Sequence, residues 1–126
     1  MKVIKNDRTV FFDCDDTIVM WDHENHPDAL TFRDILDPDP NACYSLVPHK
    51  RHIAMLKTFK RQGFSVVVWT QGGHLWAEEV VKVLGLEEFV DIAMAKPDTY
   101  FDDIEAKDFM QRRYFKSKIV YPEDKL

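Results

Sequence analysis

Residues 10–21 read VFFDCDDTIVMW, an apolar run followed by three acids within four positions. Residues 9–12 are β-branched or aromatic, and an acidic loop ends them, so we expect a buried strand there. The side chains of Asp13, Asp15 and Asp16 repel one another, and ionised carboxylates are costly beside a low-dielectric core. A role that offsets this cost is therefore expected for these acids.

Composition and charge are typical of a globular protein, and we expect residues 1–126 to form a single domain. Apolar residues make up 45% of the chain, yet no apolar run is long enough to span a membrane, so no membrane partner is expected. The net charge of −5 disfavours sequence-independent nucleic-acid binding, although a local basic patch is compatible with it. The two cysteines form no spaced framework and no signal-peptide pattern begins the chain, so we expect reduced thiols and a cytoplasmic location.

Strand and helix patterns alternate along the chain. This alternation predicts an α/β fold, a Rossmann-like three-layer sandwich with a central, mostly parallel sheet and helices on both faces. Residues 18–48 have room for a short flap hairpin, with strands near 30–33 and 42–47, but not for a large cap domain. The expected core strands are 9–12, 64–69, 91–95, 99–101 and 118–121, and the expected helices are 49–62, 74–84 and 104–114.

Polar residues follow the first four of these core strands. Because the carboxyl ends of parallel strands share one edge of a sheet, where ligands bind, these residues are expected to converge in space. Together they offer carboxylates, a hydroxyl and an ammonium group, which suit a phosphoryl group and a divalent cation that prefers oxygen ligands. The residues are Asp13 and Asp15, Thr70, Lys96, and Asp102 and Asp103.

The same residues resemble, in order, the four motifs of the haloacid dehalogenase-like hydrolase superfamily. DCDDT at residues 13–17 follows an apolar strand, as the DxDxT motif of that family does. The later motifs are VVVWT ending at Thr70, Lys96-Pro97, and Asp102-Asp103, so the resemblance covers most of the chain. Only five residues separate Lys96 from Asp102, where many members carry a whole helix, although the pattern resembles that of some of the smallest members.

The resemblance implies catalytic roles for the first two acids. Asp13 would attack phosphorus and form an aspartyl-phosphate. Asp15 would protonate the departing oxygen and then deprotonate the water that breaks the intermediate. For both acids the alternative is a solvated or capping loop. Asp16 is explained equally well as a turn residue or helix cap and as a member of the site.

Thr70 and Lys96 would act on the phosphate group in the same scheme. The resemblance implies that Thr70 donates to a phosphate oxygen, assisted by main-chain N–H groups of the next loop at a helix N-terminus. That loop comprises Gln71, Gly72 and Gly73. Lys96 would neutralise the nucleophile and the developing phosphoryl charge. An ordinary strand-terminal threonine and a surface lysine before a proline are the alternatives.

Magnesium is the cofactor that the resemblance implies. Its ligands would be the Asp13 carboxylate, the main-chain carbonyl of Asp15 and the Asp102 carboxylate. Asp103 would lie beside the ion and reach it through water. An acidic helix start is the alternative for Asp102 and Asp103, since negative charge is favourable there.

Residues 49–52 read HKRH and place positive charge at the start of a predicted helix. Positive charge there opposes the helix dipole, so another group is expected to compensate it. Substrate phosphate and simple tolerance by solvent are both compatible with the sequence.

The sequence thus predicts a magnesium-dependent phosphomonoester hydrolase that works through an aspartyl-phosphate. Its partner would be a phosphorylated substrate. A site with so little cover suits a bulky substrate, such as a nucleotide, a phosphorylated polymer or nucleic-acid end, or a protein, or it suits closure by a second copy of the chain. Four aromatic residues between the motifs would line the entrance or pack in the core: Trp21, Phe32, Tyr44 and Trp76.

A receiver-type signalling module is the alternative from another class. Receivers also combine acids after the first strand with a hydroxyl residue and a Lys-Pro at later strand ends. They lack an essential acid two positions beyond the phosphoaccepting aspartate, and that aspartate lies on a middle strand. Residues 22–63 offer no Asp at the end of an apolar run, which weighs against this alternative.

Overall fold

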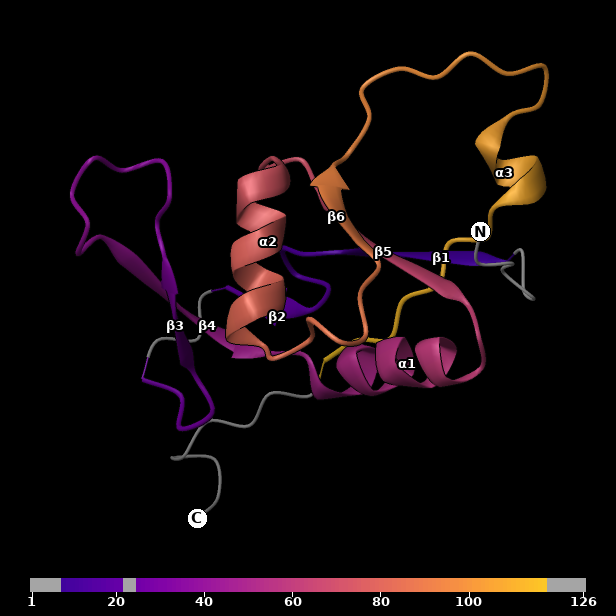
Figure 1. Ribbon diagram of the computed structural model, residues 1–126. Coiled ribbons are helices and arrows are strands. Elements are labelled where there is room, and N and C mark those ends of the chain that lie inside the picture. The colour runs from indigo at the N-terminus through magenta and orange to yellow at the C-terminus, as the bar shows by residue number, and fades with distance from the viewer. Residues whose placement is uncertain (1–7, 22–24, 118–126) are drawn as a thin grey trace.

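The computed structural model describes residues 8–21 and 25–117, and Figure 1 shows how their elements are arranged. Three parallel strands form the central sheet, as expected for an α/β protein. No helix within the described ranges is long and apolar enough to cross a membrane. The strands are β1 (Thr9–Asp13), β5 (Ser65–Thr70) and β6 (Ile92–Ala95), in the order β1-β5-β6.

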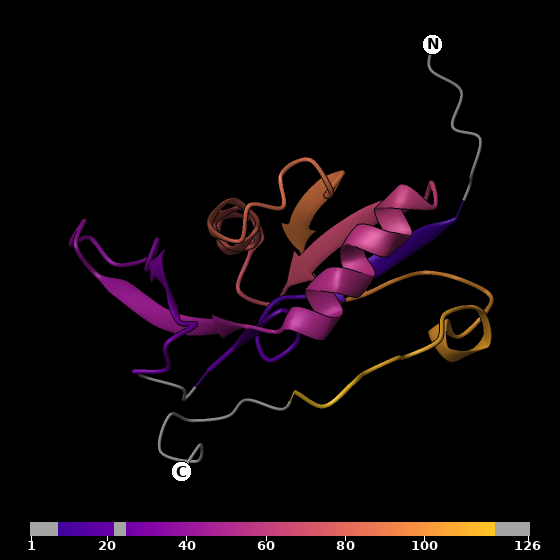
Figure 2. The same cartoon turned by 90° about the horizontal axis from the view of Figure 1, so that it is seen from below.

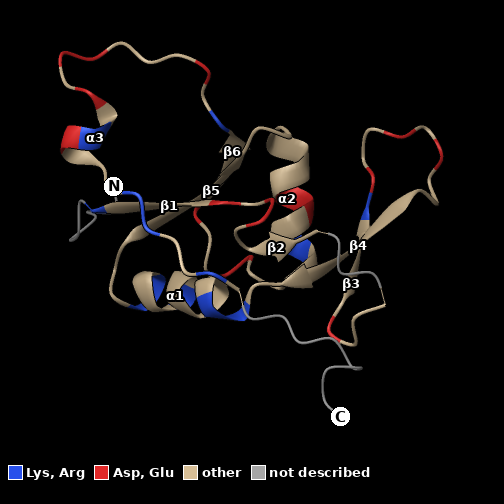
Figure 3. Ribbon diagram, turned by 180° about the vertical axis from the view of Figure 1, so that it is seen from behind, with Lys and Arg blue, Asp and Glu red and all other residues tan. Residues whose placement is uncertain are grey.

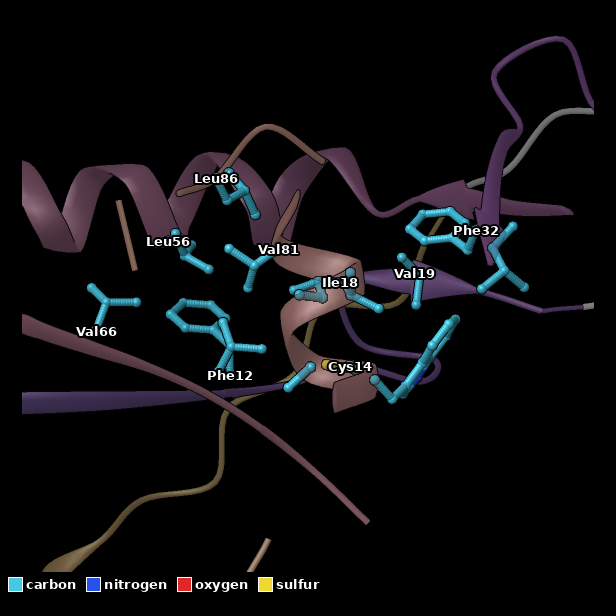
Figure 4. Close-up of a cluster of buried hydrophobic side chains, with 14 residues drawn as sticks. Phe12, Cys14, Ile18, Val19, Phe32, Leu56, Val66, Val81 and Leu86 are labelled. Atoms are coloured by element: carbon cyan, nitrogen blue, oxygen red, sulfur yellow. The ribbon is translucent and has the colours of Figure 1, made fainter. Parts of the chain in front are cut away.

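Two helices, α1 (Lys50–Arg61) and α2 (His74–Val83), pack on the same face of this sheet. Phe12 of β1 lies in one buried cluster with Leu56 of α1 and Val81 of α2 (Figure 4). Both crossovers move in the same direction across the sheet, and right-handed crossovers then return on the same face. The buried core therefore lies between the helices and one side of the strands.

The opposite face of the sheet is more open. The register aligns Phe11 with Val67 and Val67 with Ile92, so these three side chains share that face. Phe11 is 37% exposed and Ile92 is 52% exposed. A small α/β protein with a parallel three-stranded sheet is thus confirmed, whereas the second helical layer of a Rossmann-like sandwich is not.

The expected hairpin is present and forms a second, antiparallel sheet. Its strands are β2 (Val19–Met20), β3 (Leu30–Arg33) and β4 (Cys43–Pro48), in the order β2-β4-β3. The side chain of Phe32 is fully buried, and its ring centroid lies 6.0 Å from that of Trp76 on α2. The main-chain N–H of Arg33 donates to the carboxylate of Glu79 at 2.8 Å. These contacts hold the hairpin against α2.

The two cysteines are free thiols with opposite surroundings. Cys14 is fully buried in the core cluster, and burial raises the pKa of its thiol. Cys43 is exposed at the start of β4.

The segment after β6 differs from the prediction. Residues 99–101 are not a strand, and Phe101 is 99% exposed. The helix expected at 104–114 is reduced to one turn, α3 (Ala106–Phe109), which buries no residue. A three-residue strand gains few ladder hydrogen bonds, and a helix without a buried face has little to stabilise it. The strand expected at 118–121 lies outside the described residues.

The course of this segment is visible in Figures 1 and 2. From β6 it arches away from the sheet to α3 and then returns to the first turn of α1. There the main-chain N–H of Phe115 donates to the His52 imidazole at 2.9 Å. The end of the described chain is thereby joined to the start of α1.

Candidate active site

The acidic loop turns sharply after β1. Asp16 has a φ of 61°, in the left-handed region that favours turns. The main-chain N–H of Ile18 donates to the carbonyl of Cys14 at 3.0 Å, which closes the turn. The Asp16 carboxylate accepts a hydrogen bond from the main-chain N–H of Trp21 at 3.3 Å. Asp16 was considered as a turn residue or helix cap and as a member of the site. These contacts favour the role as a turn residue.

Asp13 is the last residue of β1, and its side chain is partly buried. The Thr17 hydroxyl lies 3.5 Å from its Oδ2 atom. Burial raises the pKa of the Asp13 carboxyl, whereas the Lys96 ammonium lowers it. Because burial has the larger effect, the ionised carboxylate would be favoured by further positive charge beside it.

Thr70 and Lys96 lie together at the carboxyl edge of the sheet. The main-chain N–H of Lys96 donates to the carbonyl of Thr70 at 2.8 Å. The Thr70 side chain is buried, and its hydroxyl oxygen accepts from the main-chain N–H of Gly72 at 3.1 Å. The hydroxyl proton is therefore directed elsewhere, to an anion or to Asp15, whose Oδ2 lies 3.5 Å away.

Asp15 is held by two tryptophans. Its Oδ1 atom accepts from the indole N–H of Trp21 at 3.0 Å and from that of Trp76 at 3.0 Å. Sequence reasoning offered these residues only as core or entrance aromatics. The signal that could have found them is chemical, because a buried indole N–H usually has an acceptor and a half-buried carboxylate needs donors.

The loop after β5 has the features of an anion-binding turn. Gly73, the residue before α2, has a φ of 95° and a ψ of 164°, a combination open essentially to glycine. Glycine has no side chain that could cap the first turn, so the N–H groups there stay available for an anion. Gln71 and Gly72 are exposed in the same loop. Their predicted role in substrate binding stays a prediction.

Asp102 and Asp103 do not join this group. Both are exposed, and the Asp102 carboxylate accepts from the main-chain N–H of Ile104 at 3.0 Å. Figure 3 shows that acids between β6 and α3 lie on the part of the chain that arches away from the sheet. Within the described residues, no group of three or more His, Cys, Asp or Glu side chains could hold a metal ion. The predicted set of magnesium ligands therefore stays a prediction.

His49 and His52 are structural residues. Both are buried, and their rings stack with centroids 3.8 Å apart. His49 caps α1, since its Nδ1 accepts from the main-chain N–H of His52 at 3.1 Å. Two further ring nitrogens lie close to main-chain carbonyls. His52 Nδ1 is 2.8 Å from the carbonyl of Thr17, and His49 Nε2 is 2.8 Å from the carbonyl of Phe115. These contacts join the acidic loop, α1 and the C-terminal segment.

The positive charge at the start of α1 has partners of its own. The Lys50 ammonium lies 3.1 Å from the Asp28 carboxylate. The Arg51 guanidinium lies 3.7 Å from the ring centroid of Phe115, a distance typical of a cation–π contact. The Lys50 side chain is 79% exposed, which is compatible with tolerance of its charge by solvent.

Comparisons of the chain with models of protein families, with curated proteins and with solved structures found no match. The geometry defines a small α/β protein with a carboxylate, a second carboxylate two residues later, a buried hydroxyl and a lysine at one sheet edge. Four of the predicted site residues are thus brought together: Asp13, Asp15, Thr70 and Lys96.

Proposed function

We propose that this protein is a magnesium-dependent phosphomonoester hydrolase of the haloacid dehalogenase-like type. The observation that carries the proposal is the convergence of two carboxylates with different partners, Asp13 beside Lys96 and Asp15 beside Thr70. A nucleophile must be ionised, whereas a proton donor must carry a proton, so the two acids need different surroundings. The two acids lie two residues apart and have different neighbours, the Lys96 ammonium for Asp13 and the Thr70 hydroxyl for Asp15.

In the first step, an oxygen of the Asp13 carboxylate attacks phosphorus, and the bond from phosphorus to the substrate oxygen breaks. Asp15 gives its proton to the departing oxygen, so that an alcohol leaves and an acyl phosphate remains on Asp13. Lys96 offsets the negative charge that gathers during attack. The Thr70 hydroxyl and the amides of the loop after β5 hold the phosphate oxygens.

In the second step, the ionised Asp15 takes a proton from a water molecule, which attacks the phosphorus of the acyl phosphate. The bond between phosphorus and the Asp13 oxygen breaks, so inorganic phosphate leaves and the Asp13 carboxylate is regenerated. One ester and one water are converted to one alcohol and one phosphate, and both acids return to their starting states.

Magnesium is the proposed cofactor, with Asp13, the carbonyl of Asp15, Asp102 and, through water, Asp103 as ligands. When bound, the ion would supply positive charge that the desolvated Asp13 carboxylate favours. The segment that carries Asp102 and Asp103 would have to approach β1 when the ion binds. The Rossmann-like three-layer arrangement is likewise proposed, and the open face that carries Phe11 and Ile92 supports it, because such a face is usually covered.

The test uses the full-length protein and p-nitrophenyl phosphate with magnesium, with EDTA, and with magnesium restored. We expect many turnovers with magnesium, none with EDTA, and recovery when the ion is returned. A release of no more than one phosphate per chain would instead indicate a phosphoaccepting signalling module, and equal rates with and without EDTA would remove the metal from the proposal.

A further inference from the structure

The two oxygens of the Asp15 carboxylate have different surroundings. Oδ1 accepts two hydrogen bonds, each of 3.0 Å, from the indole N–H groups of Trp21 and Trp76. Oδ2 lies 3.5 Å from the Thr70 hydroxyl, at the edge of the sheet where the phosphate is proposed to bind. An indole N–H is only a donor, so both lone pairs of Oδ1 are occupied. Oδ2 is therefore the oxygen of Asp15 that remains for a contact with the substrate.

The positions of the two indole rings are fixed by close packing. Trp76 is 7% exposed, and a Cβ atom at Gly72 would come within 3.0 Å of its Cδ1 atom. The ring centroid of Trp21 lies 4.9 Å from that of Tyr44, and the centroid of Tyr44 lies 5.9 Å from that of Trp76. The hairpin and α2 thus hold both donors in place.

With only one hydrogen bond, the Asp15 carboxylate could still rotate about its Cβ–Cγ bond. Two donors from separate elements, Trp21 after β2 and Trp76 on α2, converge on the same oxygen and remove that freedom. Both indole N–H groups donate to Asp15, so the effect that they have on the reaction passes through that carboxylate.

We propose that Trp21 and Trp76 are positioning residues, which hold Asp15 so that its Oδ2 faces the leaving oxygen of the substrate. This inference rests on the proposed function. In the step concerned, the bond from phosphorus to the leaving oxygen breaks while Oδ2 gives up its proton to that oxygen, and Asp15 becomes a carboxylate. The electron pair of the broken bond stays on the leaving oxygen and receives the proton.

The test compares two substrates that differ in their need for this proton. The leaving group of p-nitrophenyl phosphate is stable as an anion, whereas that of an alkyl phosphate such as glycerol 2-phosphate is not. In Trp21→Phe and Trp76→Phe we expect kcat/KM for the alkyl phosphate to fall by about tenfold or more, since general acids contribute at least this much. We expect kcat/KM for p-nitrophenyl phosphate to fall much less, because this ratio reports only the steps up to departure of the leaving group and not the later attack of water, which is the same for both substrates.

Tyr44→Phe is the matched control. It removes a hydroxyl from the same aromatic cluster, but this hydroxyl donates to Asp34 and not to Asp15. We expect the ratio of the two kcat/KM values to stay at the wild-type level in this variant. Equal losses of kcat/KM with both substrates in the tryptophan variants, or the same change of this ratio in Tyr44→Phe, would overturn the positioning role.

A spectroscopic measurement keeps the inference testable if Trp76→Phe does not fold. The chain has three tryptophans, and the third, Trp69, packs against Phe11 with ring centroids 4.2 Å apart. In Asp15→Asn, we expect the indole ¹⁵N–¹H signals of Trp21 and Trp76 to move and that of Trp69 to stay. Unmoved signals would contradict the contact itself. A wild-type protein that hydrolyses neither substrate would overturn the proposed function, and the positioning role with it, even if the signals move.

Discussion

The main-chain N–H of Phe115 donates to Nε2 of His52 at 2.9 Å, although 63 positions separate the two residues. The other ring nitrogen of His52 lies 2.8 Å from the carbonyl of Thr17 and donates to it. The neutral ring satisfies both contacts, with Nδ1 as donor and Nε2 as acceptor. A protonated ring has no acceptor left for the Phe115 amide, so this junction depends on the charge of one imidazole.

The first prediction is that the protein loses stability below about pH 6.5. Burial lowers the pKa of His52 from its ordinary value of 6.5, so the unfolded chain takes up a proton more readily than the folded one. The stabilisation is therefore fully present above pH 6.5 and is lost as the pH falls toward the folded pKa. His52→Phe should cost about 2 kcal/mol at pH 7, because it leaves the Phe115 amide and the Thr17 carbonyl without this partner.

Thermal unfolding at pH 7 and pH 5 checks this prediction. The difference in thermal midpoint between wild type and His52→Phe should be smaller at pH 5 than at pH 7. The exposed His74→Gln variant should have the midpoint of the wild type at both pH values. A difference of the same size at both pH values would show that His52 contributes only packing.

The second prediction concerns Asp13→Asn, which should lower turnover of p-nitrophenyl phosphate by at least about 10³-fold, because the nucleophile is lost. It should also raise the thermal midpoint at pH 7. Burial raises the pKa of this carboxyl, so at neutral pH the folded state holds a disfavoured charge that the amide does not carry. The gain should vanish near pH 3, below the ordinary pKa of 3.8, where the carboxyl is protonated in both states. An active Asp13→Asn protein would refute the assignment of the nucleophile.

The third prediction separates the proposed metal ligand from other acids of the same segment. Asp102→Asn should raise the magnesium concentration needed for half-maximal activity by about tenfold or more. Asp108→Asn removes an exposed carboxylate from α3 and should leave that concentration unchanged. The side-chain oxygen of Asn can still accept from Ile104, so the local turn is retained. Identical magnesium curves for the two variants would exclude Asp102 as a ligand.

The fourth prediction compares the loop after β5 with another glycine of positive φ. A Cβ atom would meet nothing within 4 Å at Gly73 or at Gly85, which have φ values of 95° and 67°. Gly73→Ala and Gly85→Ala should therefore each cost about 1–3 kcal/mol through backbone strain alone. Only Gly73→Ala should also raise KM for the phosphate ester, because it tilts amides that face the phosphate. A comparable rise in Gly85→Ala would indicate a general loss of structure.

The parts of the fold that could be predicted are those with strong local patterns. Strand β5 was expected at 64–69 and is Ser65–Thr70, because an unbroken apolar run requires burial on both sides. Helix α1 was expected at 49–62 and is Lys50–Arg61, with His49 as its cap. The convergence of Thr70 and Lys96 followed from parallel strands alone, since their ends must share one edge.

The features that the sequence did not predict depend on contacts between residues that are distant in sequence. Residues 99–101 have a strand-like composition, but a three-residue strand forms only if a neighbour accepts it, and no strand among the described residues pairs with them. The roles of Trp76 and His52 rest on partners 61 and 35 positions away, Asp15 and Thr17. No periodicity or motif within a single sequence records such pairings.

Because only one of the two thiols is exposed, a fluorescent dye can be attached to the hairpin alone. A maleimide dye should attach to Cys43 and leave Cys14 untouched, because the buried thiol is neither reachable nor ionised. The wild-type chain therefore accepts a fluorophore at one defined point of β4 without any engineering. A change in the emission of that dye on addition of vanadate would indicate that an anion at the proposed site alters the surroundings of β4.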